Sequence, residues 1–126
     1  MGILQAAEPM VVICTRDRDR AEAFYRDTLG LTLASEDTMA AVFSVGGITL
    51  RLSTVEGFVP HEHTILGFRV TDVPGAVAAL RQKGVAFNTY PAFRQDELGV
   101  LSIPGTAIKV AWLNDPDGNV LSVTNA

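Results

Sequence analysis

The sequence has one cysteine, few aromatic residues and no long apolar run. Cys14 has no second cysteine in the chain to pair with, so nothing here calls for an oxidising compartment. No apolar stretch approaches the length of a membrane-spanning helix, and the segment Met1 to Pro9 carries Glu8 and no basic leader. We therefore expect a cytoplasmic protein without a membrane anchor or signal peptide.

Basic residues are also scarce. Ten Lys and Arg stand against fourteen Asp and Glu, which gives a net charge of −4, and the sequence contains no basic run. This balance would repel a nucleic-acid backbone, so DNA and RNA are not expected partners. What the chain does have is apolar material, because 48% of its 126 residues are hydrophobic. That is enough for the core of a single domain, 1–126.

A repeat organises the chain. The segment 15–23 matches the segment 70–78, with Asp17 aligned to Asp72. In both halves an apolar run precedes this Asp, whose carboxylate can accept the unpaired N–H groups of a helix's first turn. Each half therefore predicts a strand that leads directly into a helix.

Glycines and turn residues divide the rest of each half. Gly30 and Gly84 stand where a left-handed residue ends a helix, and extended segments follow each of them. The expected strands after the helices are 31–33, 39–45 and 48–53, then 85–90, 100–103, 108–113 and 120–124. This order predicts an α+β fold of two βαβββ modules. The modules span about 8–54 and about 63–126, joined by a linker at 55–62.

Four sequence blocks carry a resemblance to a known family. They are 17–25 (DRDRAEAFY), 29–31 (LGL), 68–73 (FRVTDV) and 115–121 (DPDGNVL). In this order and spacing the chain resembles the vicinal oxygen chelate superfamily, which contains glyoxalase, bleomycin-resistance proteins and extradiol dioxygenases. The resemblance implies a curved sheet shaped as a cup, with helices outside and the ligand inside. It also implies a homodimer.

The resemblance further implies where a metal ion would bind. Metal-dependent members place one His, Glu or Gln on the first and last strands of each module, and the corresponding positions here are Met10, Arg51, Ile65 and Ser122. A soft thioether, a permanently charged guanidinium, an aliphatic side chain and a lone hydroxyl are poor ligands for divalent ions. We therefore expect no metal cofactor at these positions.

A displaced metal site is the alternative. Glu8 and His63 lie two residues upstream of two of those positions, on the same strand faces, and Glu56, Glu62 or His61 could supply a third ligand. The chain has only two histidines, and the same residues also read as a solvated linker. The displaced site would predict an enzyme with a divalent metal.

Two arginines, Arg51 and Arg69, are predicted by strand alternation to face the cup. An arginine in an apolar, concave site needs a partner, because burying its charge alone costs on the order of several kcal/mol. That partner is either a carboxylate or phenolate of a small ligand, or an acid of the protein such as Glu36, Asp37 or Glu56. The other predicted ligand contacts on this face are Met10, Ile65 and Ser122.

Aromatic residues in the second half complete the predicted ligand contacts. The segment Asn88 to Gly105 is the least strand-like part of that half and predicts a lid that carries Tyr90 and Phe93. Trp112, on the following strand, offers a large surface for stacking. The alternative is that Trp112 fills the core or a dimer contact.

Three functions follow from these features. The leading hypothesis is a small-molecule binding protein of the bleomycin-resistance type, holding a small aromatic or anionic compound in a metal-free cup. The second is a glyoxalase-like lyase, isomerase or dioxygenase that uses the displaced metal site or loop acids. The third is a subunit or regulatory module whose cup has no ligand.

Overall fold

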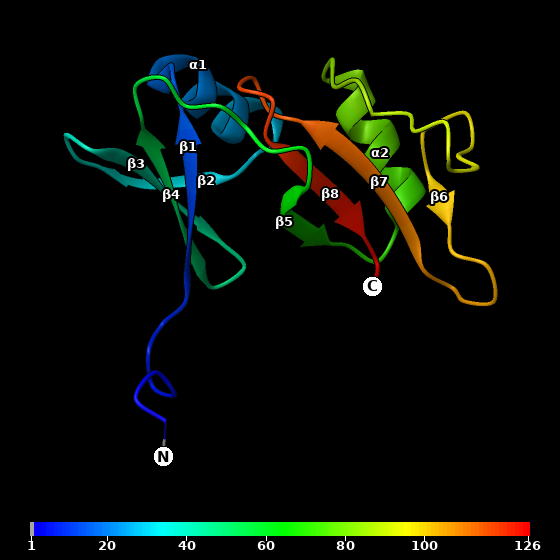
Figure 1. Ribbon diagram of the computed structural model, residues 1–126, viewed down its shortest axis with the longest axis horizontal. Coiled ribbons are helices and arrows are strands. Elements are labelled where there is room, and N and C mark those ends of the chain that lie inside the picture. Colours follow the sequence, from blue (N-terminus) through cyan, green and yellow to red (C-terminus); the bar gives the residue numbers. More distant parts are fainter. Residues whose placement is uncertain (1) are drawn as a thin grey trace. The chain divides into compact units, whose positions relative to one another are not determined.

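The computed structural model describes residues 2–126 and contains two compact units, one up to Phe58 and one from Val59 onward. The division falls inside the segment 55–62 that the sequence marks as a linker. Each unit has one four-stranded mixed sheet and one helical segment, in the order strand, helix, strand, strand, strand (Figure 1). The predicted α+β fold of two βαβββ modules is confirmed.

The first unit is built on a sheet with the strand order β1-β4-β3-β2. Its elements are β1 (Met10–Thr15), α1 (Arg18–Ala23), the π-helix η1 (Phe24–Thr28), β2 (Thr32–Glu36), β3 (Ala40–Val45) and β4 (Ile48–Thr54). β1 runs parallel to β4, and the other pairs are antiparallel. Gly46 and Gly47 both have positive φ, which gives the β3–β4 hairpin the backbone that a two-residue turn requires.

The helical segment of the first unit differs from the expected uniform α-helix. Asp17 caps it as predicted, because its carboxylate accepts the N–H of Arg20 at 3.2 Å. After Ala23 the turns widen, and the Leu29 N–H bonds to the Phe24 carbonyl five residues back. The wider turn accompanies a wholly buried Tyr25, whose ring lies 6.2 Å from that of Phe43 in the core.

The second unit repeats the plan with the strand order β5-β8-β7-β6. Its elements are β5 (Thr64–Arg69), α2 (Val73–Gln82), β6 (Leu101–Ser102), β7 (Lys109–Asn114) and β8 (Val120–Thr124). Asp72 caps α2 by accepting the Gly75 N–H at 3.0 Å, and Pro74 lies in the first turn. The turn from β7 to β8 is fixed by Asp115, whose carboxylate accepts the N–H groups of Asp117 and Asn119.

One predicted strand is wrong. Residues 85–90 make a single bridge, between Phe87 and Leu113, and form no strand. The physical reason is a side chain: the Gln95 amide accepts the Tyr90 N–H at 2.7 Å and donates to the Asn88 carbonyl at 2.9 Å. It thereby occupies backbone groups that a β-ladder would otherwise use.

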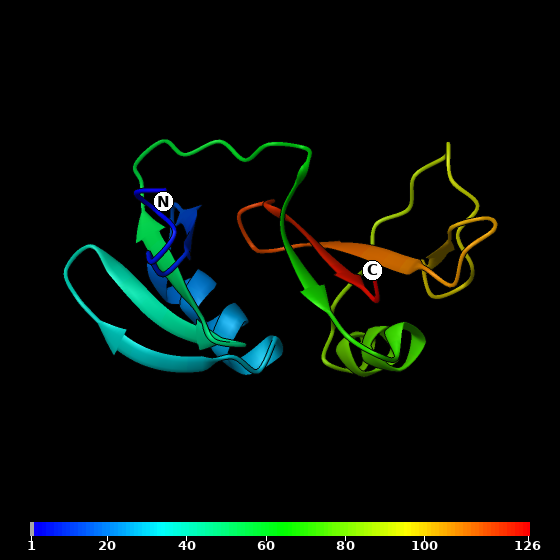
Figure 2. The ribbon, with the colours of Figure 1, turned by 90° about the horizontal axis from the view of Figure 1, so that it is seen from below.

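In each unit the helical segment covers one face of its sheet (Figure 2). The core lies between the two layers, and in the second unit it contains Val73, Val77, Val100 and Ala111. The opposite face of each sheet, called its open face below, carries no helix. None of the helices among residues 2–126 is long and apolar enough to cross a membrane.

Candidate functional site

The open face of the second sheet is organised around Trp112. In the strand register Trp112 lies opposite Ser122, and Ser122 lies opposite Gly67. A Cβ at position 67 would stand 2.9 Å from the Ser122 Oγ, so the glycine makes room for that side chain. Ser122 is buried despite this space. The largest side chain in this row of the sheet is the indole of Trp112.

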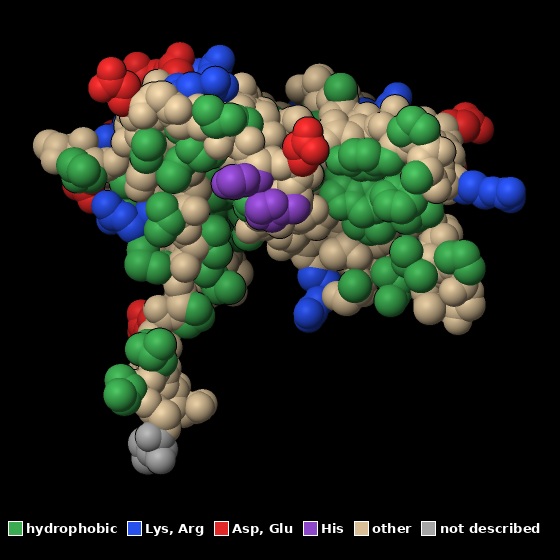
Figure 3. Space-filling view, in the orientation of Figure 1, with side chains coloured by type: hydrophobic (Ala, Val, Ile, Leu, Met, Phe, Trp, Pro, Cys, Tyr) green, Lys and Arg blue, Asp and Glu red, His purple; other side chains and the backbone are tan. Residues whose placement is uncertain are grey.

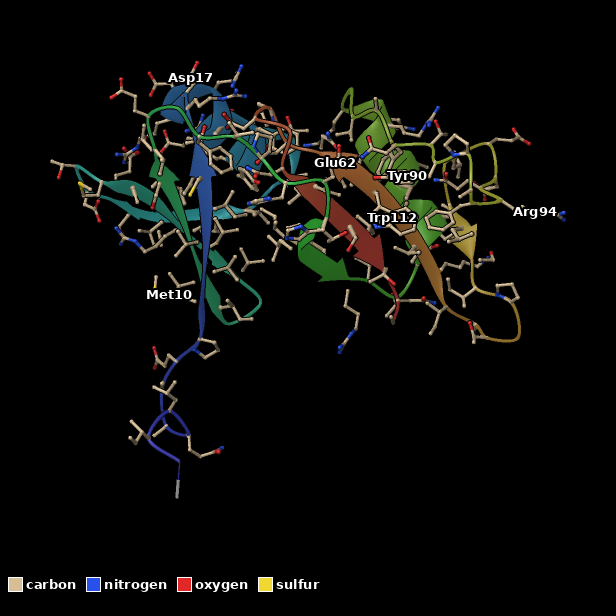
Figure 4. The ribbon with its side chains drawn as sticks, in the orientation of Figure 1. Met10, Asp17, Glu62, Tyr90, Arg94 and Trp112 are labelled. Atoms are coloured by element: carbon tan, nitrogen blue, oxygen red, sulfur yellow. The ribbon has the colours of Figure 1, made fainter. Side chains whose placement is uncertain are left out.

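Three aromatic rings form one cluster on this face. Phe93 stacks on Trp112 with centroids 5.5 Å apart, and Tyr90 meets Trp112 edge to face at 5.4 Å. Tyr90 and Phe93 are themselves 5.8 Å apart. Phe93 keeps 46% of its surface exposed, so part of the cluster is open to solvent. We call Tyr90, Phe93 and Trp112 the aromatic cluster. Figure 3 shows a patch of hydrophobic side chains over the second unit, in the region where Figure 4, in the same orientation, labels Tyr90 and Trp112.

Hydrogen bonds hold the loop that carries two of these rings. The Asn88 N–H donates to the Trp112 carbonyl at 2.8 Å, which anchors the loop to β7. The Gln95 amide spans the loop, because it also donates to the Gly99 carbonyl at 2.9 Å. One carboxylate oxygen of Asp96 accepts hydrogen bonds from the N–H groups of both Leu98 and Val100. Asp96 therefore has a structural role in the loop.

A pocket of about 850 Å³ adjoins the aromatic cluster through Tyr90, which belongs to both. Its polar lining is His61, Glu62, Asn88, Thr89, Tyr90 and Asn114. Its remaining lining is Pro60, Phe87, Gly118 and Val120. Figure 4 labels Glu62, Tyr90 and Trp112 on this side of the second unit and shows Arg94 pointing away from them. The volume is in the range of sites that hold small organic molecules.

Side-chain amides form part of the pocket wall. The Asn88 Nδ2 donates to the Asn114 Oδ1 and to the Tyr90 hydroxyl. Both hydrogens of that amide are thus engaged within the protein, and its carbonyl oxygen is the group it can offer to a ligand. Asn88 and Asn114 were missed by the sequence analysis. Their pairing depends on the approach of the loop to β7, which no local pattern indicates.

The predicted arginines have partners in the protein. The Arg51 Nη2 lies 3.3 Å from the Asp37 Oδ2, and the Arg69 Nε donates to the main-chain oxygen of Ala126 at 2.7 Å. The N–H groups of Met39 and Ala40 hydrogen-bond to Asp37 and lower the pKa of its carboxyl, and Arg51 lowers it further. Asp37 was among the protein acids expected as alternatives to an anionic ligand.

The four positions at which the family would place metal ligands do not suit a divalent ion. Met10 is 48% exposed on the open face of the first sheet, where Arg51 is held by Asp37. Ile65 lies in a bulge of β5, and Ser122 offers a single hydroxyl. Thioether, guanidinium, aliphatic and hydroxyl groups together lack the His and carboxylate ligands that such a site needs.

The two residues of the alternative, displaced metal site belong to different units. Glu8 precedes β1 in the first unit, whereas His63 precedes β5 in the second and stacks on His61 at 5.2 Å. Throughout residues 2–126, no group of three His, Cys, Asp or Glu side chains is arranged to hold an ion.

Of the eight predicted ligand contacts, the structure gathers four. Tyr90, Phe93 and Trp112 form the aromatic cluster, with Ser122 opposite Trp112. The other four are not part of this group: Met10 and Arg51 lie on the first sheet, and Ile65 and Arg69 lie on β5, which is separated from the strand of Trp112 by β8. Whether any of the eight contacts a ligand stays a prediction.

Comparisons with known proteins agree on the fold. Similar solved structures include a glyoxalase family protein from Enterococcus faecalis, with 18% identity, 97% of this chain and 99% of that chain covered, and a TM-score of 0.73. Another is a glyoxalase/bleomycin resistance protein/dioxygenase from Alicyclobacillus acidocaldarius, with 21% identity, 94% and 90% covered, and a TM-score of 0.68. A lactoylglutathione lyase from Agrobacterium tumefaciens is 19% identical, with 94% and 92% covered and a TM-score of 0.64.

Because these identities are low, the likeness shows a shared fold only. The activities that these relatives are named for are not carried over to this chain. None of the curated proteins matches the chain in sequence. The family model of the Glyoxalase/Bleomycin resistance protein/Dioxygenase superfamily, in contrast, matches residues 8–123, which is nearly the whole chain. The chain therefore belongs to the glyoxalase/bleomycin resistance protein/dioxygenase superfamily.

Proposed function

We propose that the chain is a small-molecule binding protein that holds an aromatic compound on the open face of its second unit, without a metal ion. The observation that carries this proposal is the aromatic cluster, which stands beside a pocket of about 850 Å³ and leaves Phe93 46% exposed. A planar ligand can stack on such rings and hydrogen-bond to the amides and hydroxyl of the pocket wall.

The expectation that the ligand is an anionic compound has less support. It rests on Arg51 and Arg69, and both already contact oxygen atoms of the protein. An anionic ligand would have to compete with Asp37 for Arg51. Binding of an aromatic compound requires no such competition, because the three rings of the aromatic cluster already lie together. We therefore assign recognition to the aromatic cluster.

Trp112 makes the proposal measurable, because it is the only tryptophan of the chain. A compound that stacks on the aromatic cluster should change the indole fluorescence, and titration of aromatic compounds then gives Kd. We expect Phe93→Ala to weaken binding about tenfold, the loss of roughly one stacking contact. Met39→Ala is the matched control, since Met39 is a similarly exposed apolar residue of the first unit. Equal Kd values for native protein and Phe93→Ala would contradict the proposal.

Metal independence is part of the same proposal. The donor groups at Met10, Arg51, Ile65 and Ser122 support it, because none is a good ligand for a divalent ion. We expect Kd to be unchanged after dialysis against a chelator and after addition of zinc or nickel. A ligand that binds, or is turned over, only when metal is restored would favour the enzyme alternative with Glu8 and His63.

We also propose that the protein acts in the cytoplasm as a homodimer. The lone cysteine suits a reducing compartment. Met10 and Val12 expose about half of their surfaces on the open face of the first sheet, which gives a second copy an apolar surface to cover. Light scattering should give twice the chain mass, and Val12→Lys should lower it. A native chain that stays monomeric at high concentration would rule out the dimer.

A further inference from the structure

The charge of the pocket indicates the class of ligand. None of the ten described residues that line it is Lys or Arg, and Glu62 contributes a carboxylate. This lining differs from the open face of the first sheet, where Arg51 and Asp37 offset each other. The pocket therefore presents an uncompensated negative group next to the aromatic cluster.

The neighbouring groups add to this preference. The Asn88 amide donates both of its hydrogens to Asn114 and Tyr90, so the only group it has left for a ligand is its carbonyl oxygen, an acceptor. The faces of Tyr, Trp and Phe rings carry partial negative charge and attract cations. Arg94, which follows Phe93 in the sequence, points away from the cluster (Figure 4). Carboxylate, carbonyl oxygen and ring faces all favour a positively charged group.

We propose that the ligand is an organic cation: a protonated amine or quaternary ammonium on an aromatic body. The positive group lies beside Glu62, and the ring packs on the aromatic cluster. The Tyr90 hydroxyl and the Asn114 amide can donate hydrogen bonds to a neutral acceptor elsewhere on the same molecule. This inference rests on the proposed binding function and narrows it to one charge class.

Three probes with one aromatic body test the inference: 2-naphthylmethylammonium, 2-naphthylmethanol and 2-naphthoate. Their Kd values are measured by Trp112 fluorescence at pH 8, above the range in which histidine ordinarily titrates. We expect the ammonium probe to bind about fivefold to tenfold tighter than the alcohol, and the naphthoate to bind most weakly. The preference for the ammonium probe should diminish as salt is raised.

Glu62→Gln removes the charge and keeps the shape of the side chain. It should reduce the preference for the ammonium probe severalfold and leave the alcohol unchanged. Glu97→Gln is the control, because Glu97 is an exposed acid of the same unit outside the pocket lining. A full ammonium preference in Glu62→Gln would overturn the role of Glu62.

The probes also separate this inference from the proposed function. If the alcohol and the ammonium probe bind equally and Phe93→Ala weakens both, the aromatic site stands and the charge inference is wrong. If the naphthoate binds tightest, the charge inference is likewise wrong. If none of the three changes Trp112 fluorescence or melting temperature, the proposed function fails, and the inference fails with it.

Discussion

The two units use their aromatic residues on different faces of similar sheets. In the first unit Tyr25 and Phe43 are wholly buried between sheet and helix. In the second unit the buried core cluster is aliphatic, with Val77 and Ala111 among its members and a partly buried Phe87 packed against it, and a cluster of three rings stands on the open face. One repeated plan thus supports stability with aromatic residues in one copy and, we propose, recognition in the other.

The largest expected effect contrasts two phenylalanines. Phe43→Ala removes a fully buried ring, so we expect the free energy of unfolding to fall by about 3–5 kcal/mol. The same truncation at Phe93, which is half exposed, should cost much less stability while weakening ligand binding. Urea unfolding followed by circular dichroism measures both. Comparable losses for the two variants would break the comparison.

The next effect concerns the loop that carries Tyr90 and Phe93. Gln95→Ala removes three hydrogen bonds, to Asn88, Tyr90 and Gly99, and leaves their backbone groups without that partner. We expect a loss of about 1–3 kcal/mol in unfolding free energy and weaker binding of aromatic compounds. Gln82→Ala, at the exposed end of α2, is the control. A variant with native stability would show that the bridging amide is dispensable.

A smaller effect belongs to a buried acid of the first unit. Burial raises the pKa of Glu22, and the neighbouring Glu36 raises it further, while Arg18 and Arg26 oppose this shift. The Glu22 Oε1 is buried without a hydrogen bond. A carboxyl whose pKa is higher in the folded than in the unfolded protein stabilises the fold at low pH. That contribution is lost as pH rises through the folded-state value.

Glu22→Gln removes this titration. We expect its melting temperature to exceed that of the native protein by about 2–4 °C at pH 8, and the difference to shrink toward pH 4. Glu8→Gln, an exposed acid of the same unit, should show no such trend. A gain that is constant across this pH range would mean that ionisation of Glu22 is not its cause.

The smallest effect is expected at Arg51. Because the Arg51 guanidinium already pairs with Asp37 and a neutral aromatic ligand offers it no opposite charge, Arg51→Ala should change the Kd of such a ligand by less than about twofold. Trp112 fluorescence measures it, with Phe93→Ala as the sensitive counterpart. A tenfold loss would restore Arg51 as a ligand contact and reverse our choice between the two faces.

Much of the fold follows from local patterns in the sequence. Asp17 and Asp72 cap helices because a carboxylate placed before an amphipathic run reaches the first-turn N–H groups, and both do so in the structure. The segment 85–90 alternates as a strand would, yet the backbone partners of Asn88 and Tyr90 come from the Gln95 side chain. Pattern analysis cannot detect that competition, because it depends on how a loop closes.

The candidate site divides in the same way. Residue type alone marked Tyr90, Phe93 and Trp112, because large aromatic residues on a loop and an adjacent strand can meet over one sheet. The sequence analysis missed Asn88 and Asn114, because a pair of amides becomes significant only when the loop that carries one of them approaches β7. His61 and Glu62 were considered as metal ligands, whereas the structure places them in the lining of a pocket.

The parallel pairing of β1 with β4 has a consequence for synthesis on the ribosome. Met10 lies opposite Thr49, so β1 cannot pair with its neighbouring strand until most of the first unit has been synthesised. A nascent chain that stops short of β4 would expose the apolar side chains of β1, including Ile13, to chaperones. Once β4 has left the exit tunnel, the first unit holds all of its strands while the second is still being translated.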